Sequence, residues 1–134
     1  MKNRPPLYDQ IQAAVKYITA RSTLHPKYGI VLGTGLSGLA DEIVVDAEIP
    51  YGDLPHFPIS TVGGHRGNLV LGTLEGIPVV ALAGRFHYYE GYSALELTFP
   101  IRVLKWLGID RLFLSNAAGS VNQHIFAGDL VFIK

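Results

Sequence analysis

The sequence predicts an α/β domain with a mixed sheet and flanking helices. YGIVL (28–32) is a β-branched run typical of a buried strand, and RLFLSN (111–116) and DLVFI (129–133) are continuous apolar runs typical of strands covered on both faces. Two longer segments repeat apolar residues every three or four positions, as amphipathic helices do. Two such helices are too few to cover both faces of a sheet of about five strands. We therefore expect residues 1–134 to form an incomplete, truncated domain.

The amino-terminal half is expected to begin with a helix and to continue into strands. Residues 7–20 form the first amphipathic pattern, which follows a proline pair. After the strand at 28–32 we expect a short helix over 36–42, a strand over 43–49 and a proline-containing loop over 50–58. This order places a glycine-rich turn directly after the first strand.

A hairpin and a second long helix follow. NLVLGTL (68–74) and IPVVALAG (77–84) flank a Glu-Gly dipeptide and predict a hairpin. Pro78 should keep the start of the second strand out of a central ladder, because proline has no N–H to donate. The next helix is expected to be capped by Ser93 and bent at Pro100. Its apolar positions are Leu97, Ile101, Leu104 and Leu107.

Composition limits the classes of function. The chain has 134 residues, 49% of them apolar, and a mean hydropathy of +0.26, which is enough for a core. Eleven basic residues balance eleven acidic ones, so we expect neither nucleic acid nor an anionic membrane as a partner, and any bound anion must be held locally. The absence of cysteine fits a reducing compartment, and the absence of a long apolar run argues against a signal peptide or membrane span. We expect a cytoplasmic protein.

Three polar or glycine-rich loops each follow a predicted strand. They are GTGLSG (33–38), GRFHYYEGY (84–92) and NAAGS (116–120). In open α/β sheets, ligands bind outside the carboxyl ends of the strands. The sequence therefore predicts that these loops line one pocket.

The residue types in these loops favour a small oxyanion such as phosphate. The Gly33-Thr34-Gly35 turn offers backbone N–H groups and a hydroxyl near a helix start. Arg85 adds a planar fork of donors. Ala117 is small enough for its backbone N–H to approach a ligand. His87, held by Glu90 or another acceptor, is able to orient a proton or to contact a second ligand.

Parts of these motifs also occur in dinucleotide-binding, nucleoside triphosphate-binding and metal-binding proteins. GTGLSG also satisfies G-x-G-x-x-G, and Asp53 lies 20 residues after Gly33, as in a dinucleotide-binding module. Only about ten residues separate the first strand from Ile43, however, whereas a parallel crossover needs a dozen or more. The chain contains no Gly-Lys-Ser/Thr for a nucleoside triphosphate, and its five histidines lack the close spacing of a metal pair. We predict no metal site.

Taken together, the motifs resemble those of purine nucleoside phosphorylases of the trimeric type. GIVLGTGLSGLADEI, AGRFHYYEGY and LFLSNAAGSVN carry the resemblance, which extends from Tyr28 onward. GRFHYYEGY and NAAG in that order are its most specific parts. Methylthioadenosine phosphorylases share the glycine turn but do not usually carry this GRFHxYEGY form, so they are the minor alternative. The resemblance implies phosphorolysis of purine (deoxy)ribonucleosides to the free base and (deoxy)ribose 1-phosphate, with inorganic phosphate as co-substrate and no cofactor.

The resemblance also assigns roles to individual residues. It implies that His87 and Glu90 form the catalytic pair, with Glu90 fixing His87. Tyr89 resembles the residue that contacts the ribose, and His87 lies near the ribose hydroxyls as well. Asn116 is expected to shape its loop. The implied phosphate ligands are Thr34, His65, Arg85, His87 and the Ala117 N–H.

The length of the chain departs from the family pattern. Members of the family are about twice as long, within the usual range of one α/β domain. We therefore expect this chain to carry the phosphate site and part of the ribose site but not the base site. Full-length relatives are expected to be trimers, and the 134-residue chain alone is expected to show negligible phosphorolysis. The alternative is a non-catalytic fragment that binds phosphate weakly.

Overall fold

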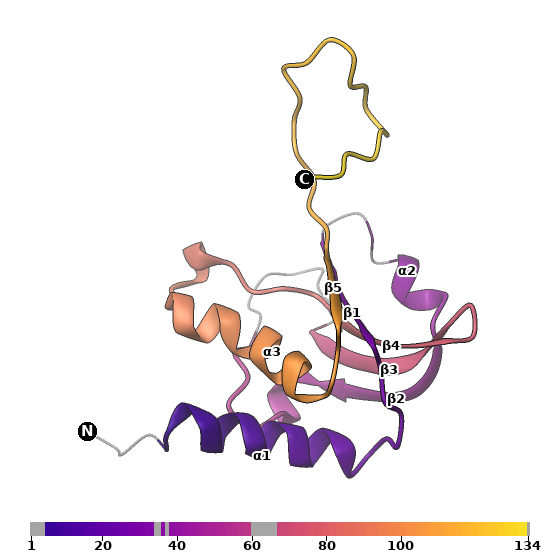
Figure 1. The fold of residues 1–134 in the computed structure, drawn as a ribbon. Helices are drawn as coiled ribbons and strands as arrows, with labels where there is room; N and C mark the ends of the chain where they lie inside the picture. Colours follow the sequence, from indigo (N-terminus) through magenta and orange to yellow (C-terminus); the bar gives the residue numbers. More distant parts are fainter. Residues whose placement is uncertain (1–4, 34–35, 37, 60–66, 134) are drawn as a thin grey trace.

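A computed structural model describes residues 5–33, 36, 38–59 and 67–133 (Figure 1). Five strands form one sheet in the order β2-β3-β4-β1-β5, with helices against it, which confirms the α/β class. The strands are β1 (Tyr28–Leu32), β2 (Val44–Pro50), β3 (Asn68–Leu74), β4 (Ile77–Ala83) and β5 (Arg111–Leu114). The helices are α1 (Leu7–Thr19), α2 (Gly38–Asp41) and α3 (Ala94–Trp106), with 3₁₀ turns η1 (Tyr51–Asp53) and η2 (Tyr88–Glu90).

The sheet is mixed, as expected. β2, β3 and β4 form an antiparallel meander, and β1 runs parallel to both β4 and β5. The predicted hairpin is confirmed as β3 and β4. Pro78 pairs with Thr73 on β3, whereas the parallel ladder with β1 begins one residue later, at Val79. The proline therefore lies outside the central parallel ladder, where its missing N–H costs no bond to β1.

Both long helices pack on the same face of the sheet. Ile18 of α1 and Leu104 of α3 are fully buried there against sheet residues such as Leu69. The start of α3 is set by a capping box, in which the Ser93 Oγ accepts from the Glu96 N–H at 3.3 Å and the Glu96 carboxylate accepts from the Ser93 N–H. Pro100 lies within α3, which continues through it.

The opposite face of the sheet is covered differently. In the described part of the chain, α2 is the helix that packs there, over a smaller cluster that includes Leu32, Ala40, Val70 and Val79. Two long helices thus cover one face and a four-residue helix covers part of the other. This asymmetry agrees with the expected truncated domain. No helix in the described ranges combines the length and the apolar content needed to cross a bilayer.

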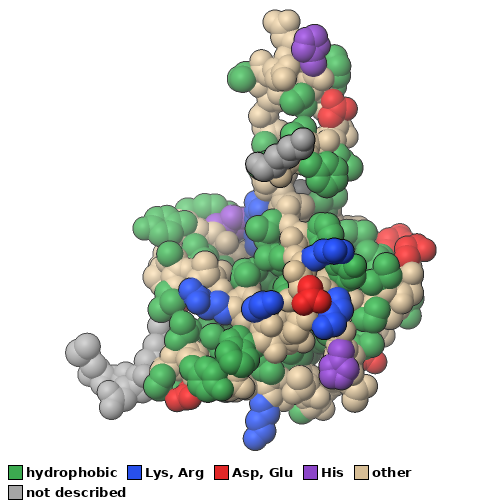
Figure 2. Space-filling view, viewed as in Figure 1, with side chains coloured by type: hydrophobic (Ala, Val, Ile, Leu, Met, Phe, Trp, Pro, Cys, Tyr) green, Lys and Arg blue, Asp and Glu red, His purple; other side chains and the backbone are tan. Residues whose placement is uncertain are grey.

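Two predictions about the carboxyl-terminal runs are wrong. β5 forms, but Phe113 and Leu114 are exposed, so this strand is not covered on both faces. Residues 129–133 form no strand; they belong to a long loop that stands away from the sheet and turns back toward the end of β5 (Figures 1 and 2). A strand needs a neighbour to satisfy its backbone groups, and in the described residues DLVFI pairs with none.

Candidate functional site

The parallel strands bring the three predicted loops to one edge of the sheet. Leu32 of β1 is in register with Ala83 of β4, and Val31 is in register with Leu114 of β5. The residues that follow these strands therefore emerge side by side at the carboxyl edge. The three loops thus begin at one edge, as predicted. The cavity described below is lined by residues of the second and third loops, and Thr34, Gly35 and Ser37 of the first loop lie outside the described residues, so a pocket shared by all three loops stays a prediction.

The ends of β1 and β5 are joined by Ser115, a residue that the sequence analysis did not single out. Its hydroxyl accepts a hydrogen bond from the Gly33 N–H at 3.0 Å and donates to the Val31 carbonyl at 3.1 Å. The backbones that follow β1 and β5 approach so closely that a Cβ on Gly33 would lie 2.5 Å from the Ser115 carbonyl oxygen. The only signal in the sequence is the position of Ser115, directly between an apolar run and NAAG.

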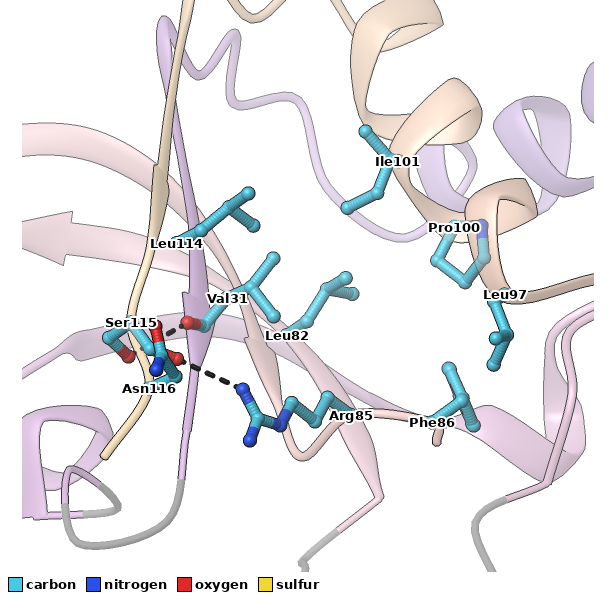
Figure 3. Close-up of a pocket in the computed structure, with 10 residues that line it drawn as sticks. All are labelled: Val31, Leu82, Arg85, Phe86, Leu97, Pro100, Ile101, Leu114, Ser115 and Asn116. Carbon is cyan, nitrogen blue, oxygen red and sulfur yellow. Dashed lines mark hydrogen bonds between the residues drawn. The ribbon is translucent and has the colours of Figure 1, made fainter. Parts of the chain in front are cut away.

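Arg85 connects the loop after β4 to the end of β5. Its Nη1 donates to the Ser115 carbonyl at 3.2 Å (Figure 3). Its Nε donates to His87 Nε2 at 3.2 Å. The guanidinium is a permanent cation with five donors in one plane. Two contacts from different segments therefore fix the orientation of a strong oxyanion ligand.

His87 and Glu90 form the contact that the sequence predicted. The Glu90 Oε1 lies 3.0 Å from His87 Nδ1 and also accepts from the His87 backbone N–H at 2.8 Å. The Glu90 side chain is only 2% exposed. Because His87 Nε2 accepts from Arg85, the network places the imidazole proton on Nδ1, where it is donated to Glu90.

Tyr89 is stacked on His87. The two ring centroids are 4.8 Å apart with an interplanar angle of 16°, and the tyrosine is otherwise exposed. Stacking holds the phenol ring beside the imidazole. The predicted ribose contact is thus next to the predicted catalytic pair.

A buried tyrosine, Tyr51, holds the start of the loop after β4. The Tyr51 hydroxyl donates to the Gly84 carbonyl at 2.7 Å, and its ring packs 5.0 Å from that of Phe86. Burial raises the pKa of Tyr51 far above its usual range, so the phenol stays protonated. Tyr51 lies in the segment predicted as a proline-containing loop, and nothing in its local sequence indicates this long-range bond.

A cavity of about 370 Å³ opens beside these residues (Figure 3). Arg85, Ser115 and Asn116 form its polar end. The rest of the lining is apolar and comes from the sheet, from α3 and from the loop after β4: Val31, Leu82, Leu114, Leu97, Pro100, Ile101 and Phe86. The polar groups are thus gathered at one end of an otherwise apolar opening.

The remaining predicted residues are distributed as follows. Ala117 is exposed in the loop after Ser115, and the Asn116 side chain donates to its carbonyl at 3.2 Å. Thr34 and His65, both predicted phosphate ligands, lie outside the described residues. Among the residues that are described, no three His, Cys, Asp or Glu side chains cluster as metal ligands.

The topology contradicts the dinucleotide-binding alternative. That fold requires β1, its glycine-rich turn and a helix to lead into a neighbouring parallel strand. Here β2, the next strand in the chain, pairs antiparallel with β3 at the far edge of the sheet. Asp53, the predicted ribose ligand of that alternative, lies in η1 rather than at a strand end.

Comparisons with known proteins agree with this geometry. The family model described as the phosphorylase superfamily matches residues 27–134. Purine nucleoside phosphorylase 1 of Bacillus subtilis is 53% identical over 93% of this chain and 46% of its own length. Purine nucleoside phosphorylase of Bos taurus is 39% identical over 95% of this chain and 44% of its own length. The chain thus spans a little under half the length of the curated relatives it matches.

A solved structure gives the same picture. Isoform 2 of purine nucleoside phosphorylase from Schistosoma mansoni, in complex with cytosine and ribose-1-phosphate, superposes with a TM-score of 0.82 at 45% identity. The superposition covers 91% of this chain and 43% of that chain. Fold and sequence therefore point to the same family.

Proposed function

Because the chain belongs to the phosphorylase superfamily, we propose that it carries the phosphate site and part of the ribose site of a purine nucleoside phosphorylase. The reaction is phosphorolysis of a purine (deoxy)ribonucleoside to the free base and (deoxy)ribose 1-phosphate. Inorganic phosphate is the co-substrate, and no cofactor is needed. The base site is supplied by the part of the relatives' length that this chain does not span.

The observation that carries the proposal is the placement of Arg85. Its guanidinium is held between the Ser115 carbonyl and His87 Nε2 at the carboxyl edge of the parallel strands. Within the described residues these contacts use Nε and Nη1, and we propose that Nη2 donates to the phosphate. An arginine fixed in this way suits bidentate binding of phosphate, and the Ala117 N–H adds a neutral donor. Thr34 and His65 complete the proposed ligand set.

The proposed chemistry needs an anion placed close to the sugar. A phosphate oxygen forms a bond to the anomeric carbon while the bond from that carbon to the base nitrogen breaks, and the base leaves with the bonding electrons and takes up a proton. The transition state has oxocarbenium character, so the phosphate is both nucleophile and counter-charge. Arg85 would hold the phosphate in line with the departing base.

The ribose would be held by the second half of the same loop. Tyr89 and His87 present a phenol and an imidazole side by side, and Glu90 fixes the imidazole through Nδ1. In the described network Nδ1 faces Glu90 and Nε2 accepts from Arg85. With the proton held on Nδ1, Nε2 would orient a sugar hydroxyl by accepting from it in place of the bond from Arg85. This is the proposed role of the His87 and Glu90 pair.

We also propose a homotrimeric assembly in the cytoplasm, as the family resemblance implies. Light scattering on the purified full-length protein would measure its mass. A stable monomer at micromolar concentration would contradict the trimer.

Phosphate binding tests the proposed site directly. Thermal unfolding of the 134-residue chain would be measured in phosphate and in chloride at equal ionic strength. A ligand that binds only the native state adds about 1.4 kcal/mol at ten times its dissociation constant. Arg85→Ala should abolish the phosphate-specific shift, and Arg102→Ala, which removes an exposed arginine on α3, should not. An unmodified chain that unfolds identically in both salts would contradict the phosphate site.

Turnover requires the rest of the fold. We would join this chain to the remaining segment of the Bacillus subtilis relative and assay inosine phosphorolysis, with methylthioadenosine as the alternative substrate. The chimera should release hypoxanthine, and Arg85→Ala should lower kcat/KM for phosphate by about 100-fold. The 134-residue chain alone should remain at background. A folded chimera that binds phosphate but turns over neither nucleoside would favour the second candidate, a non-catalytic phosphate binder.

A further inference from the structure

We infer that Ser115 is a positioning residue that sets the orientation of Arg85 by ending the ladder between β1 and β5. The inference rests on the proposed function, because it concerns how the proposed phosphate ligand is held. It assigns Ser115 no contact with substrate.

The hydrogen bonds at the end of β1 depart from the regular parallel pattern. Parallel strands exchange evenly spaced backbone bonds, so the register of Val31 with Leu114 predicts that the Gly33 N–H donates to the Ser115 carbonyl. Instead, the Gly33 N–H donates to the Ser115 Oγ at 3.0 Å. The same hydroxyl donates to the Val31 carbonyl at 3.1 Å, beside the Ser115 N–H at 3.4 Å. A side chain has therefore replaced one backbone acceptor.

The replacement leaves the Ser115 carbonyl available for a different donor. That donor is Arg85 Nη1, at 3.2 Å. Because the guanidinium is planar, a bond at Nη1 and a bond from Nε to His87 together fix the plane of all five donors. Ser115 thus acts on the proposed anion ligand through its own carbonyl.

The next backbone hydrogen bond of a regular ladder, from the Ala117 N–H to the Gly33 carbonyl, is also replaced. The Gly33 carbonyl, which in a regular ladder would accept from the Ala117 N–H, accepts from the Leu36 N–H at 3.2 Å. The Ala117 N–H is the backbone donor that we propose for phosphate. Ending the ladder at Ser115 therefore serves both proposed ligands at once, since it frees a carbonyl for Arg85 and separates Ala117 from β1.

Without the hydroxyl, the register of β1 with β5 would pair the Gly33 N–H with the Ser115 carbonyl. The close approach of these chain ends favours that exchange, because a Cβ on Gly33 would already lie 2.5 Å from this oxygen. The ladder would then extend by one bond, and Arg85 would lose a fixed partner. Loss of the hydroxyl should thus affect phosphate affinity more than it affects folding.

The test compares side chains that differ only in the hydroxyl. Threonine and valine have nearly the same shape, so Ser115→Thr retains the hydroxyl and Ser115→Val removes it; Ser115→Ala is a second removal in case valine prevents folding. Dissociation constants for inorganic phosphate would be measured by calorimetry on the 134-residue chain at fixed ionic strength. Ser120→Ala, on the exposed part of the same loop, is the matched control. Urea unfolding confirms that each variant is folded.

We expect Ser115→Val or Ser115→Ala to raise the dissociation constant about fivefold to tenfold, the worth of one or two net hydrogen bonds. Ser115→Thr should stay within about twofold of the unmodified chain. Equal phosphate affinity with and without the hydroxyl, alongside loss in Arg85→Ala, would overturn the inference and leave the proposed function standing. An unmodified chain that binds no phosphate would overturn both.

Discussion

β4 and the run at 130–133, in the loop after β5, are both apolar, yet they have opposite environments. In β4, Val80 and Ala81 are 0% exposed, because the strand has neighbours on both edges and helices near both faces. In the segment after β5, Phe132 is 85% and Ile133 is 94% exposed. Similar composition therefore gives a core in one region and a free surface in the other. Burial depends on the neighbours that the rest of the fold supplies.

The proposed site lies at the border between these two regions. Arg85 and its support, Tyr51, belong to the covered side, whereas Ser115 and Ala117 belong to the open side. Figure 2 shows the loop after β5 rising from the body with apolar side chains along it. Such a border is where a rigid scaffold meets a partly uncovered edge, and ligand groups are common in that position.

The largest expected difference in unfolding free energy comes from making the same Leu→Ala substitution once in the core and once in the loop after β5. Leu69 is 0% exposed on β3, and Leu130 is 83% exposed in the loop after β5. Leu69→Ala should lower the free energy of unfolding by about 2–5 kcal/mol, because it leaves a cavity in the core. Leu130→Ala should change it by no more than about 0.5 kcal/mol. Urea unfolding of both variants measures this, and equal losses would show that the loop is packed in solution.

The close approach of β1 and β5 at this border can be tested by substituting two glycines with alanine. Gly33→Ala places a Cβ 2.5 Å from the Ser115 carbonyl, so β1 and β5 must separate, at a cost of about 1–3 kcal/mol. Gly38→Ala lies a few residues further on, at the start of α2, where an added Cβ meets nothing within 4 Å. Its helix propensity should make it neutral or slightly stabilising. Similar unfolding free energies for both would contradict the close strand approach.

The buried hydrogen bond from Tyr51 to the Gly84 carbonyl can be tested by substitution and by the pH dependence of stability. Tyr51→Phe leaves the Gly84 carbonyl without its buried donor and should cost about 1–3 kcal/mol at neutral pH. The pKa of Tyr51 is raised in the folded state above its usual value of 10.0, so its contribution is complete below pH 10 and is lost as the pH rises above it.

The unmodified chain should therefore lose stability above pH 10 more steeply than Tyr51→Phe. Unfolding free energies from pH 7 to pH 11 check this, with Tyr88→Phe, an exposed phenol of the η2 turn, as the control. Parallel curves for the unmodified chain and Tyr51→Phe would contradict the buried phenol.

The smallest expected effect concerns a helix start on the covered side. Ser93→Ala removes the cap of α3 and should cost about 1 kcal/mol, whereas Ser93→Asp should retain most of it. Ser120→Ala, in the exposed loop, should have little effect. If Ser93→Ala were also neutral, the packing of α3 on the sheet would be sufficient to fix its start.

Much of the fold was predictable because its signals are local. The hairpin strands at 68–74 and 77–83, α1 and β1 all agree with the predicted bounds to within one residue. The strand expected at 129–133 was wrong because an apolar run does not specify its neighbour. For the site, the loops and the His87–Glu90 contact were predictable from residue type and short spacing. Ser115 was missed because its role depends on a register between distant segments.

The sequence by itself determined most of the helices and strands, since those choices depend on side-chain periodicity, caps and turns within a few residues, with the run at 129–133 as the exception. It also determined the family, because GRFHYYEGY and NAAG are specific sequence motifs that occur in this order along the chain. Only the tertiary structure decided that Gly33, Arg85 and Ser115 meet. The reason is that parallel strands far apart in the chain align their carboxyl ends only after the sheet has assembled.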